Sequence, residues 1–286
     1  MKLLIINSWI HYKNKIGFEN ILQYLNIEYK YGDLNDINDY DIIYSPSDSI
    51  DTSKYKNKFF IFGPHFSVFP DNKLNQINNI HNNSIYILPS QWCVTEWNNI
   101  LKNNLLPIKS FPFPVDSDKF KSIKSIEDRK EVFIYYKSRN PEELHYIENF
   151  LNNKNISYKL FDYMKTYKEQ EYIDFLLNSK YGIWIGRHES QGFALQEALS
   201  CDVPLFVWDV KSMNQEYGYS YDDIPATTIP YWDNSCGEYF HTINELENIF
   251  EKFINNLSNY KPRNFILNNL DTKQCSNKFK TIINSF

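Results

Sequence analysis

The chain has 286 residues, a formal net charge of −5 and an apolar content of 42 %. This length suits one large or two medium domains, and the apolar content is ample for a packed core. No basic run or stripe stands out along the chain. The composition therefore argues against extended nucleic-acid binding.

The four cysteines, at positions 93, 201, 236 and 275, are scattered, and none forms a C-x-x-C pair or a cluster with histidine. We therefore expect reduced thiols and a cytoplasmic protein. The apolar run at residues 3–6 is too short for a signal peptide, and no segment approaches the roughly 20 apolar residues that span a bilayer. A peripheral contact with a membrane surface stays open.

Short apolar runs alternate with helical patterns in the first part of the chain. Strands are predicted at 3–6, 27–30, 39–45, 58–62 and 84–90, and helices at 17–25 and 91–101. This alternation predicts a parallel sheet with helices on both faces. Prolines 112 and 114 stiffen the segment that follows and block sheet pairing, so we place a domain boundary between residues 115 and 116.

One histidine and one pair of aspartates in this first part are considered as site residues. His65 follows the strand at 58–62, and open α/β sheets bind ligands beyond the carboxyl ends of their strands. His65 is therefore a candidate contact for an acceptor or a transferred sugar, although a structural role in an aromatic loop stays open. Asp39 and Asp41 form a D-x-D pair that precedes a strand instead of following one. We therefore expect polar residues at a strand start and not metal ligands.

The same alternation continues after residue 116. Strands are predicted at 132–136, 157–163, 181–185, 203–208 and 226–229, and helices at 142–151, 169–177, 243–257 and, with breaks, 264–286. Lys137 and Arg139 follow the first of these strands. Two cations at the carboxyl end of a strand suit a diphosphate. The alternative is a pair of solvated loop charges.

A polar turn and a helix lie between the strands at 181–185 and 203–208. The first N–H groups of a helix lack internal partners and lie at the positive end of its dipole, so they suit a phosphate. Ser190 is the expected N-cap, and Gly192 lets the backbone approach a ligand closely. A carboxylate would repel a phosphate, so Glu189 and Glu197 should face hydroxyl groups.

Glu189 and Glu197 are eight residues apart, with Gly192-Phe193 between them and Pro204 after them. This pattern resembles the E-x7-E motif of retaining GT-B glycosyltransferases, particularly the GT4-like group (glycosyl transferases group 1). The chain departs from the usual motif in three places. Ser190-Gln191 precede the Gly-Phe pair, Ala194 replaces a second glycine, and Asp202 replaces the glycine after Cys201.

The resemblance implies an α/β protein with the GT-B fold, in which two facing Rossmann-like domains with parallel sheets enclose an interdomain cleft. Residues 1–115 would form the acceptor-side domain and residues 116–286 the nucleotide-sugar-binding domain, with the last helix packing back on the first domain. The implied activity is a retaining, hexosyltransferase-type transfer from a nucleotide-sugar donor to a glycan, lipid-linked or protein acceptor. No metal and no other cofactor is expected.

The resemblance also assigns roles to individual residues. Glu189 would bind hydroxyls of the donor sugar, Glu197 the ribose, and Lys137 and Arg139 the diphosphate. Tyr163 or Tyr167 would stack on the base, and Gly17 would approach the donor or the acceptor unless it only marks the start of a helix. Backbone N–H groups of one short segment would hold the diphosphate as well: Ser190, Gln191, Gly192, Phe193 and Ala194.

Four alternatives stay open at this point, one of which is a sugar-binding protein with two domains. The chain can be a different enzyme on the same architecture, such as a nucleotide-sugar epimerase. It can be a degenerate GT-B protein that binds a nucleotide or a partner without transfer. It can also contain an ordinary βαβ turn in which Glu197 faces solvent.

Overall fold

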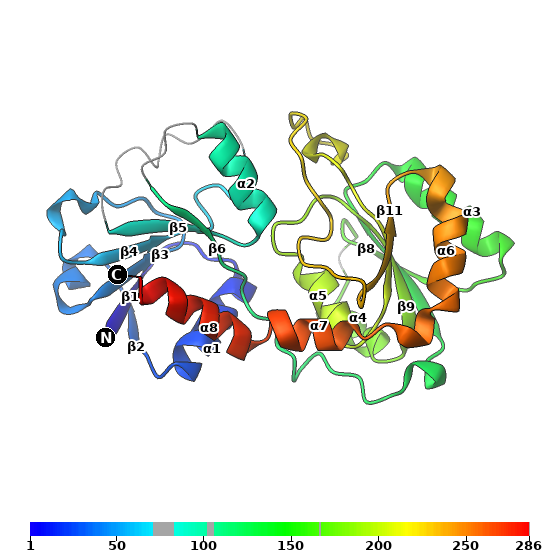
Figure 1. The fold of residues 1–286 in the computed structure, drawn as a ribbon, viewed down its shortest axis with the longest axis horizontal. Helices are drawn as coiled ribbons and strands as arrows, with labels where there is room; N and C mark the ends of the chain where they lie inside the picture. Colours follow the sequence, from blue (N-terminus) through cyan, green and yellow to red (C-terminus); the bar gives the residue numbers. More distant parts are fainter. Residues whose placement is uncertain (71–82, 102–105, 166, 286) are drawn as a thin grey trace. The chain divides into compact units, whose positions relative to one another are not determined.

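The computed structural model describes residues 1–70, 83–101, 106–165 and 167–285, which fall into two compact units (Figure 1). The first unit comprises residues 1–114 and 270–286, and the second comprises residues 115–269. The chain leaves the first unit after Pro114, next to the boundary expected from the sequence, and returns to it at Leu270. The second unit is therefore a continuous stretch inserted into the first.

The first unit contains a six-stranded parallel sheet with the strand order β2-β1-β3-β4-β5-β6. Its strands are β1 (Lys2–Ile6), β2 (Glu28–Gly32), β3 (Ile42–Ser45), β4 (Phe59–Phe62), β5 (Ser84–Leu88) and β6 (Ile108–Ser110). Its helices are α1 (Tyr12–Tyr24), α2 (Gln91–Ile100) and α8 (Thr272–Ile283). Buried strands of this kind read as continuous apolar runs, because both faces of a parallel sheet are covered.

Helices cover both faces of this sheet (Figure 1). Trp97 of α2 is fully buried in a cluster with residues of β1, β3, β4 and β5. On the other face, the ring of Phe18 in α1 lies 4.4 Å from that of Tyr44 and 5.2 Å from that of Phe279 in α8. The last helix is thus part of the core of the first unit.

Helix α1 begins at Tyr12, five residues before the predicted start, so the prediction that Gly17 belongs to a loop or a helix start is wrong. The first turn of α1 is polar, so the sequence shows no apolar residues at helical spacing there. One of these polar residues, Asn14, is nevertheless buried. A Cβ atom at position 17 would lie 3.0 Å from Cδ of Pro114. The missing side chain of Gly17 therefore makes room for Pro114.

The second unit contains a five-stranded parallel sheet with the order β11-β10-β9-β7-β8. Its strands are β7 (Glu131–Lys137), β8 (Lys159–Asp162), β9 (Ser179–Gly186), β10 (Leu205–Trp208) and β11 (Gly237–Phe240). Its helices are α3 (Pro141–Asn153), α4 (Glu169–Leu176), α5 (Phe193–Ser200), α6 (Leu246–Asn255) and α7 (Pro262–Asn269).

One strand prediction in this unit is wrong. Residues 226–229 form no strand, and the edge strand is β11 instead. A Cβ atom at position 237, where φ is +138°, would lie 2.0 Å from the carbonyl oxygen of Leu205. Gly237 is thus required for β11 to approach β10, and this strand carries too short an apolar signal to be found in the sequence.

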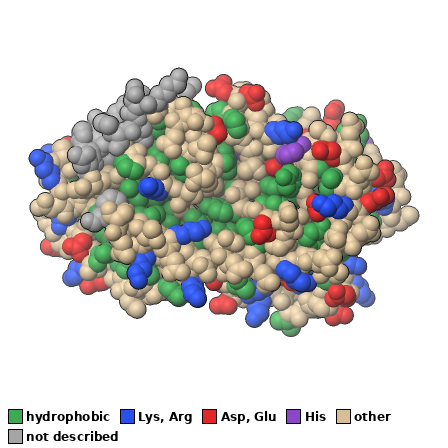
Figure 2. All heavy atoms as spheres, in the orientation of Figure 1, with side chains coloured by type: hydrophobic (Ala, Val, Ile, Leu, Met, Phe, Trp, Pro, Cys, Tyr) green, Lys and Arg blue, Asp and Glu red, His purple; other side chains and the backbone are tan. Residues whose placement is uncertain are grey.

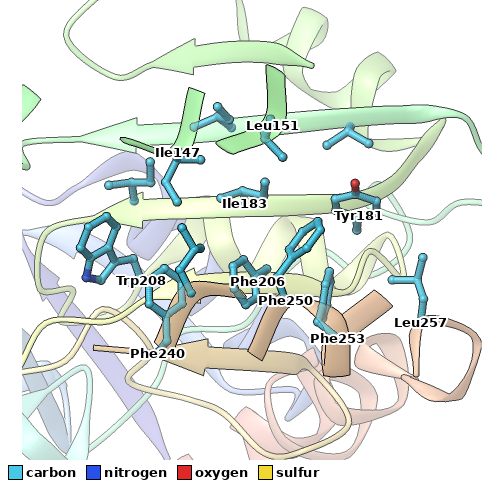
Figure 3. Packing of buried hydrophobic residues seen from close by; sticks show 14 of the residues in the cluster. Ile147, Leu151, Tyr181, Ile183, Phe206, Trp208, Phe240, Phe250, Phe253 and Leu257 are labelled. Carbon is cyan, nitrogen blue, oxygen red and sulfur yellow. The ribbon is translucent and has the colours of Figure 1, made fainter. Parts of the chain in front are cut away.

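Aromatic and aliphatic side chains pack between the sheet and helices α3 and α6 (Figure 3). Figure 3 shows Ile147 and Leu151 on one side of Ile183, and Phe250 and Phe253 on the other. Burying one such side chain fully contributes roughly 1.5–3 kcal/mol. This packing holds strands β7, β9 and β10, whose carboxyl ends carry the candidate site, in a fixed arrangement.

The four thiols are free and buried. Burial raises the pKa of each of them, Cys93, Cys201, Cys236 and Cys275, to about 12. On the face in view in Figure 2, Lys and Arg side chains are scattered among Asp and Glu. Within the described ranges, no helix combines the length and the apolar character needed to cross a membrane.

Candidate functional site

The strand order of the second sheet changes direction between β7 and β9. After β7 the chain adds β8 on one side, and it then returns to add β9 on the other. Ligands of open α/β sheets bind beyond the carboxyl ends of the strands at such a topological switch point. Lys137 is the last residue of β7, and Arg187, His188 and Glu189 directly follow β9.

The structure brings Lys137, Glu189 and Tyr163 together at this switch point. Nζ of Lys137 lies 2.6 Å from Oε1 of Glu189, and each of the two side chains is 12 % exposed. The same Nζ lies 4.5 Å from the ring centroid of Tyr163, which is 52 % exposed. Three of the predicted site residues, at or after the carboxyl ends of β7, β8 and β9, therefore form one cluster.

Helix α5 begins at Phe193, and its N-cap is Gly192, so the prediction of Ser190 as N-cap is wrong. Gly192 has φ = +75° and ψ = +45°, the left-handed conformation that side chains disfavour. The buried Gln191 donates from Nε2 to Oε1 of Gln196 at 3.0 Å. The hydroxyl of Tyr172 donates to the carbonyl oxygen of Ala194 at 2.9 Å. These bonds fix the turn that presents the N-terminus of the helix.

Glu197 lies four residues into this helix, roughly 6 Å along its axis. It is only 3 % exposed, so the alternative of a solvent-facing Glu197 is wrong. Asp202, which replaces the expected glycine, keeps a left-handed φ of +59°. Its Oδ1 accepts from the backbone N–H of Arg263 at 3.1 Å. The departure at position 202 therefore leaves the glycine-like backbone conformation in place.

Arg139 is fully buried, which differs both from the phosphate contact and from the solvated loop charge considered above. Its guanidinium donates to both carboxylate oxygens of Glu143, with Nε at 2.8 Å and Nη2 at 2.6 Å. Nη1 donates to the carbonyl oxygens of Gly186 at 3.0 Å and Trp208 at 2.9 Å. Arg139 thus ties together the carboxyl ends of β9 and β10, and a phosphate contact would require it to leave these acceptors.

His65 and Gly17 belong to the first unit. Nε2 of His65 accepts from the backbone N–H of His11 at 3.3 Å, and its ring lies 4.6 Å from that of Trp9. Burial lowers the pKa of His65 to about 4, with a further contribution from His11. A neutral imidazole whose Nε2 accepts carries its proton on Nδ1. His65 is therefore set up to donate from Nδ1, whereas Gly17 lies buried inside α1.

A second ion pair beside the cluster was not found by sequence reasoning. Nη1 of Arg187 lies 3.1 Å from Oε2 of Glu216, and Nε2 of His188 lies 3.4 Å from the same oxygen. Burial raises the pKa of Glu216, and Arg187 opposes this shift. Burial and the charges of Arg187 and Lys137 lower the pKa of His188 to about 3.

Asp209, directly after β10, was also missed. Its Oδ1 accepts from the hydroxyl of Thr227 at 2.9 Å and from the backbone N–H of Thr228 at 2.7 Å. Burial raises the pKa of this carboxyl group. The backbone N–H of Glu189 donates to the carbonyl oxygen of Thr227 at 2.9 Å. Asp209 thus holds the segment that positions Glu189, and its place after a buried strand was the one available signal.

Among the described residues, no group of three or more His, Cys, Asp or Glu side chains is arranged to hold a metal ion. Asp39 and Asp41 precede β3, and Oδ2 of Asp41 accepts from the backbone N–H of Lys2 at 2.8 Å. The D-x-D pair therefore lies at the amino end of the first sheet, away from the edge where its strands carry His65.

Comparisons with known proteins show the fold. No family model and no curated protein sequence matches the chain. The solved structures that resemble it include AviGT4, described as a glycosyltransferase involved in avilamycin A biosynthesis, with a TM-score of 0.58 and 11 % identity over 98 % of this chain and 96 % of that one.

Two further structures resemble it over most of its length. The N-terminal domain of trehalose-6-phosphate phosphatase from Candida albicans has a TM-score of 0.58 and 11 % identity, over 95 % of this chain and 74 % of that one. The catalytic domain of starch synthase IV from Arabidopsis thaliana, bound to ADP and acarbose, has a TM-score of 0.52 and 10 % identity, over 94 % and 76 %. The chain therefore has the GT-B fold, with two Rossmann-like domains that each contain a parallel sheet.

Proposed function

We propose that the protein is a glycosyltransferase that moves a sugar from a nucleotide-sugar donor to an acceptor hydroxyl with retention of the anomeric configuration. The observation that carries this proposal is the Lys137–Glu189 pair at the switch point of the second sheet, next to the turn that opens α5. Two of the structures with the same fold are described as a glycosyltransferase and as a starch synthase domain bound to ADP and acarbose.

The donor would lie along this edge of the second sheet. Backbone N–H groups at residues 190–194 and Nζ of Lys137 would hold the diphosphate. Glu189 would accept hydrogen bonds from hydroxyls of the donor sugar, and Glu197 from those of the ribose. Tyr163, which is exposed and lies beside Lys137, would stack on the base.

In the proposed reaction the bond between the anomeric carbon and the diphosphate oxygen breaks, and the acceptor oxygen bonds to the anomeric carbon from the same face. The acceptor proton passes to the departing diphosphate. Negative charge develops on that group, where Lys137 and the N-terminus of α5 would stabilise it. These fixed positive groups support the proposal that no metal is required.

Two further predicted residues would have other tasks. Arg139, with its bonds to the ends of β9 and β10, would position the loops of the site instead of touching the phosphates. His65 would donate from Nδ1 to the acceptor or to the transferred sugar.

The test is a screen with UDP-, GDP- and ADP-sugars. A bound nucleotide at 100 times its Kd should stabilise the protein by about 2.7 kcal/mol in thermal unfolding. With the donor found in this way, release of nucleoside diphosphate is measured with and without candidate acceptors. We expect Glu189→Gln to lower the transfer rate by about 100-fold or more while nucleotide binding is kept.

The matched control is Glu171→Gln, because Glu171 pairs with Lys159 in an exposed part of the same unit. This variant should transfer at the wild-type rate. Transfer at the wild-type rate by Glu189→Gln would overturn the role of Glu189. Nucleotide binding without turnover of any donor would favour the degenerate GT-B protein, and an epimerised donor without acceptor would favour the epimerase.

A further inference from the structure

The segment between β10 and β11 carries a loop that sequence reasoning treated as irregular. Its base is closed by an antiparallel bridge between Ser212 and Pro225 and by a 2.9 Å bond from the N–H of Met213 to the carbonyl oxygen of Ile224. Three tyrosines alternate along this loop: Tyr217, Tyr219 and Tyr221.

Three contacts hold this loop against the switch point of the same unit. The backbone N–H of Tyr217 donates to the carbonyl oxygen of Ser138, the neighbour of Lys137, at 2.9 Å. Glu216 pairs with Arg187 at 3.1 Å. The ring of Tyr221 meets the ring of His188, the neighbour of Glu189, edge to face at 5.4 Å. The loop therefore borders both residues of the Lys137–Glu189 pair.

Two of the three tyrosine rings are largely exposed, and the third, Tyr221, is half-buried. Tyr217 is 57 % exposed and Tyr219 is 61 % exposed. The rings of Tyr219 and Tyr221 lie 5.8 Å apart and are close to parallel, with 17° between their planes. Gly218 has φ = +85° in open space, so the chain turns between the first two tyrosines in a conformation that favours glycine.

We propose that Tyr217, Tyr219 and Tyr221 form a carbohydrate-binding surface that holds a glycan acceptor next to the donor site. Aromatic faces carry negative charge density that attracts the C–H face of a pyranose ring, and phenol hydroxyls can donate to and accept from sugar hydroxyls. The acceptor role rests on the proposed transfer activity, whereas carbohydrate binding does not.

The charges of the loop favour a neutral ligand. Glu216, Asp222 and Asp223 are the charged residues between positions 212 and 225, and all three are acidic. Because Glu216 pairs with Arg187, Asp222 and Asp223 give the loop its net negative charge. An acidic loop repels phosphates, so a nucleic acid, the diphosphate of the donor or an anionic lipid surface fits it poorly. Tyr163 already provides an exposed ring beside Lys137 for a nucleobase. A neutral glycan remains as the ligand class that suits both the rings and the charges.

The experiment measures binding of neutral oligosaccharides to the full chain. An array of such oligosaccharides identifies the best ligand, whose Kd is then measured by calorimetry for the wild type and for Tyr219→Ala, Tyr221→Ala and Tyr219→Phe. The matched control is Tyr146→Ala, because Tyr146 is a single tyrosine on α3 that is 57 % exposed. Nucleoside diphosphate affinity is measured for all variants.

We expect about tenfold weaker oligosaccharide binding for Tyr219→Ala and Tyr221→Ala, and little change for Tyr219→Phe, which keeps the ring, and for Tyr146→Ala. Nucleotide affinity should stay unchanged in all of them. If transfer is found, the acceptor KM should rise in Tyr219→Ala while kcat stays within about twofold.

Two results would overturn the proposal. One is that no neutral oligosaccharide binds the wild type or that Tyr219→Ala binds it equally well. The other is that Tyr219→Ala weakens nucleotide binding, which would assign the rings to the donor. Failure of the transfer activity alone leaves the binding measurement intact, so the two proposals fail separately.

Discussion

Nζ of Lys137 lies 2.6 Å from Oε1 of Glu189, although the two residues are 52 positions apart in the chain. The sequence suggested opposite tasks for them, a phosphate contact and a sugar contact. In the structure they neutralise each other at a site where both side chains are nearly buried. Removal of one partner therefore leaves a charge with little access to water.

The first prediction concerns this pair. We expect Lys137→Met to lower the free energy of unfolding by about 3 kcal/mol, because it removes the cation that pairs directly with the nearly buried carboxylate of Glu189. The double variant Lys137→Met/Glu189→Gln should lose at least about 1 kcal/mol less than the sum of the single losses. Urea denaturation measures the free energy of unfolding of Lys137→Met, of Glu189→Gln and of the double variant. Lys159→Met, in the exposed pair with Glu171, should change stability by no more than about 0.5 kcal/mol. Additive losses at positions 137 and 189 would contradict the coupling.

The second prediction concerns Arg139. Lysine cannot reproduce the fork that donates to Glu143 and to the carbonyl oxygens of Gly186 and Trp208. We expect Arg139→Lys to cost about 2–4 kcal/mol of unfolding free energy, measured by urea denaturation. Nucleotide affinity, measured under conditions in which the variant is folded, should fall by less than about tenfold. The reason is that Arg139 would position the loops of the site without contacting the phosphates. A stable variant that loses nucleotide binding completely would instead restore Arg139 as a phosphate ligand.

The third prediction concerns Gly192. A Cβ atom at this position would lie 3.6 Å from Cβ of Glu189, which is ordinary contact, so alanine meets strain and not a clash. We expect Gly192→Ala to cost about 1–2 kcal/mol because φ is +75°. Gly192→Asn should cost less, since asparagine tolerates this conformation better. Thermal unfolding ranks the three proteins, and equal stability of the alanine variant and the wild type would refute the argument.

The fourth prediction concerns pH. The pKa of His188 is about 3 in the folded protein and about 6.5 in the unfolded chain, so below pH 6.5 the unfolded state binds a proton that the folded state does not. The contribution of His188 to the free energy of unfolding is therefore fully present above about pH 6.5. It is lost as the pH falls, by about 1.4 kcal/mol per pH unit. His65, with a pKa of about 4, acts in the same direction.

Comparison of pH 7 with pH 5 isolates this effect. From pH 7 to pH 5, the free energy of unfolding of His188→Gln, measured by urea denaturation, should fall by about 2 kcal/mol less than that of the wild type. Glu216, whose pKa is raised by burial, acts in the opposite direction, and it is present in both proteins. An equal loss in both would show that His188 is protonated in the folded state.

The sequence predicted those parts of the site that depend on local periodicity. The apolar runs ending at Lys137 and before Glu189 became β7 and β9, and a parallel pair of strands places their carboxyl ends at one edge. The cluster of Lys137, Glu189 and Tyr163 was therefore within reach of sequence reasoning. The burial of Arg139 was not, because its carbonyl acceptors lie 47 and 69 residues away and depend on tertiary packing.

Other misses have related physical causes. Asn14 and its polar neighbours concealed the first turn of α1, since an Asn that bonds to a distant His65 looks like a loop residue in isolation. The segment that follows β10 has no regular hydrophobic period. It contains Asp209 and Thr227, which are joined by a hydrogen bond, and the tyrosine loop at 217–221. The positions of Thr227 and of the tyrosine loop follow from hydrogen bonds to Asp209 and Ser138, which directly follow β10 and β7, and no local pattern encodes these bonds.

The distribution of the buried cysteines offers a practical consequence. Cys93 and Cys275 belong to the first unit, and Cys201 and Cys236 belong to the second. An alkylating reagent can reach each of these sulfurs only after the surrounding structure opens. Timed alkylation followed by mass spectrometry of the peptides would therefore record, without any engineered label, which half of the polypeptide opens first.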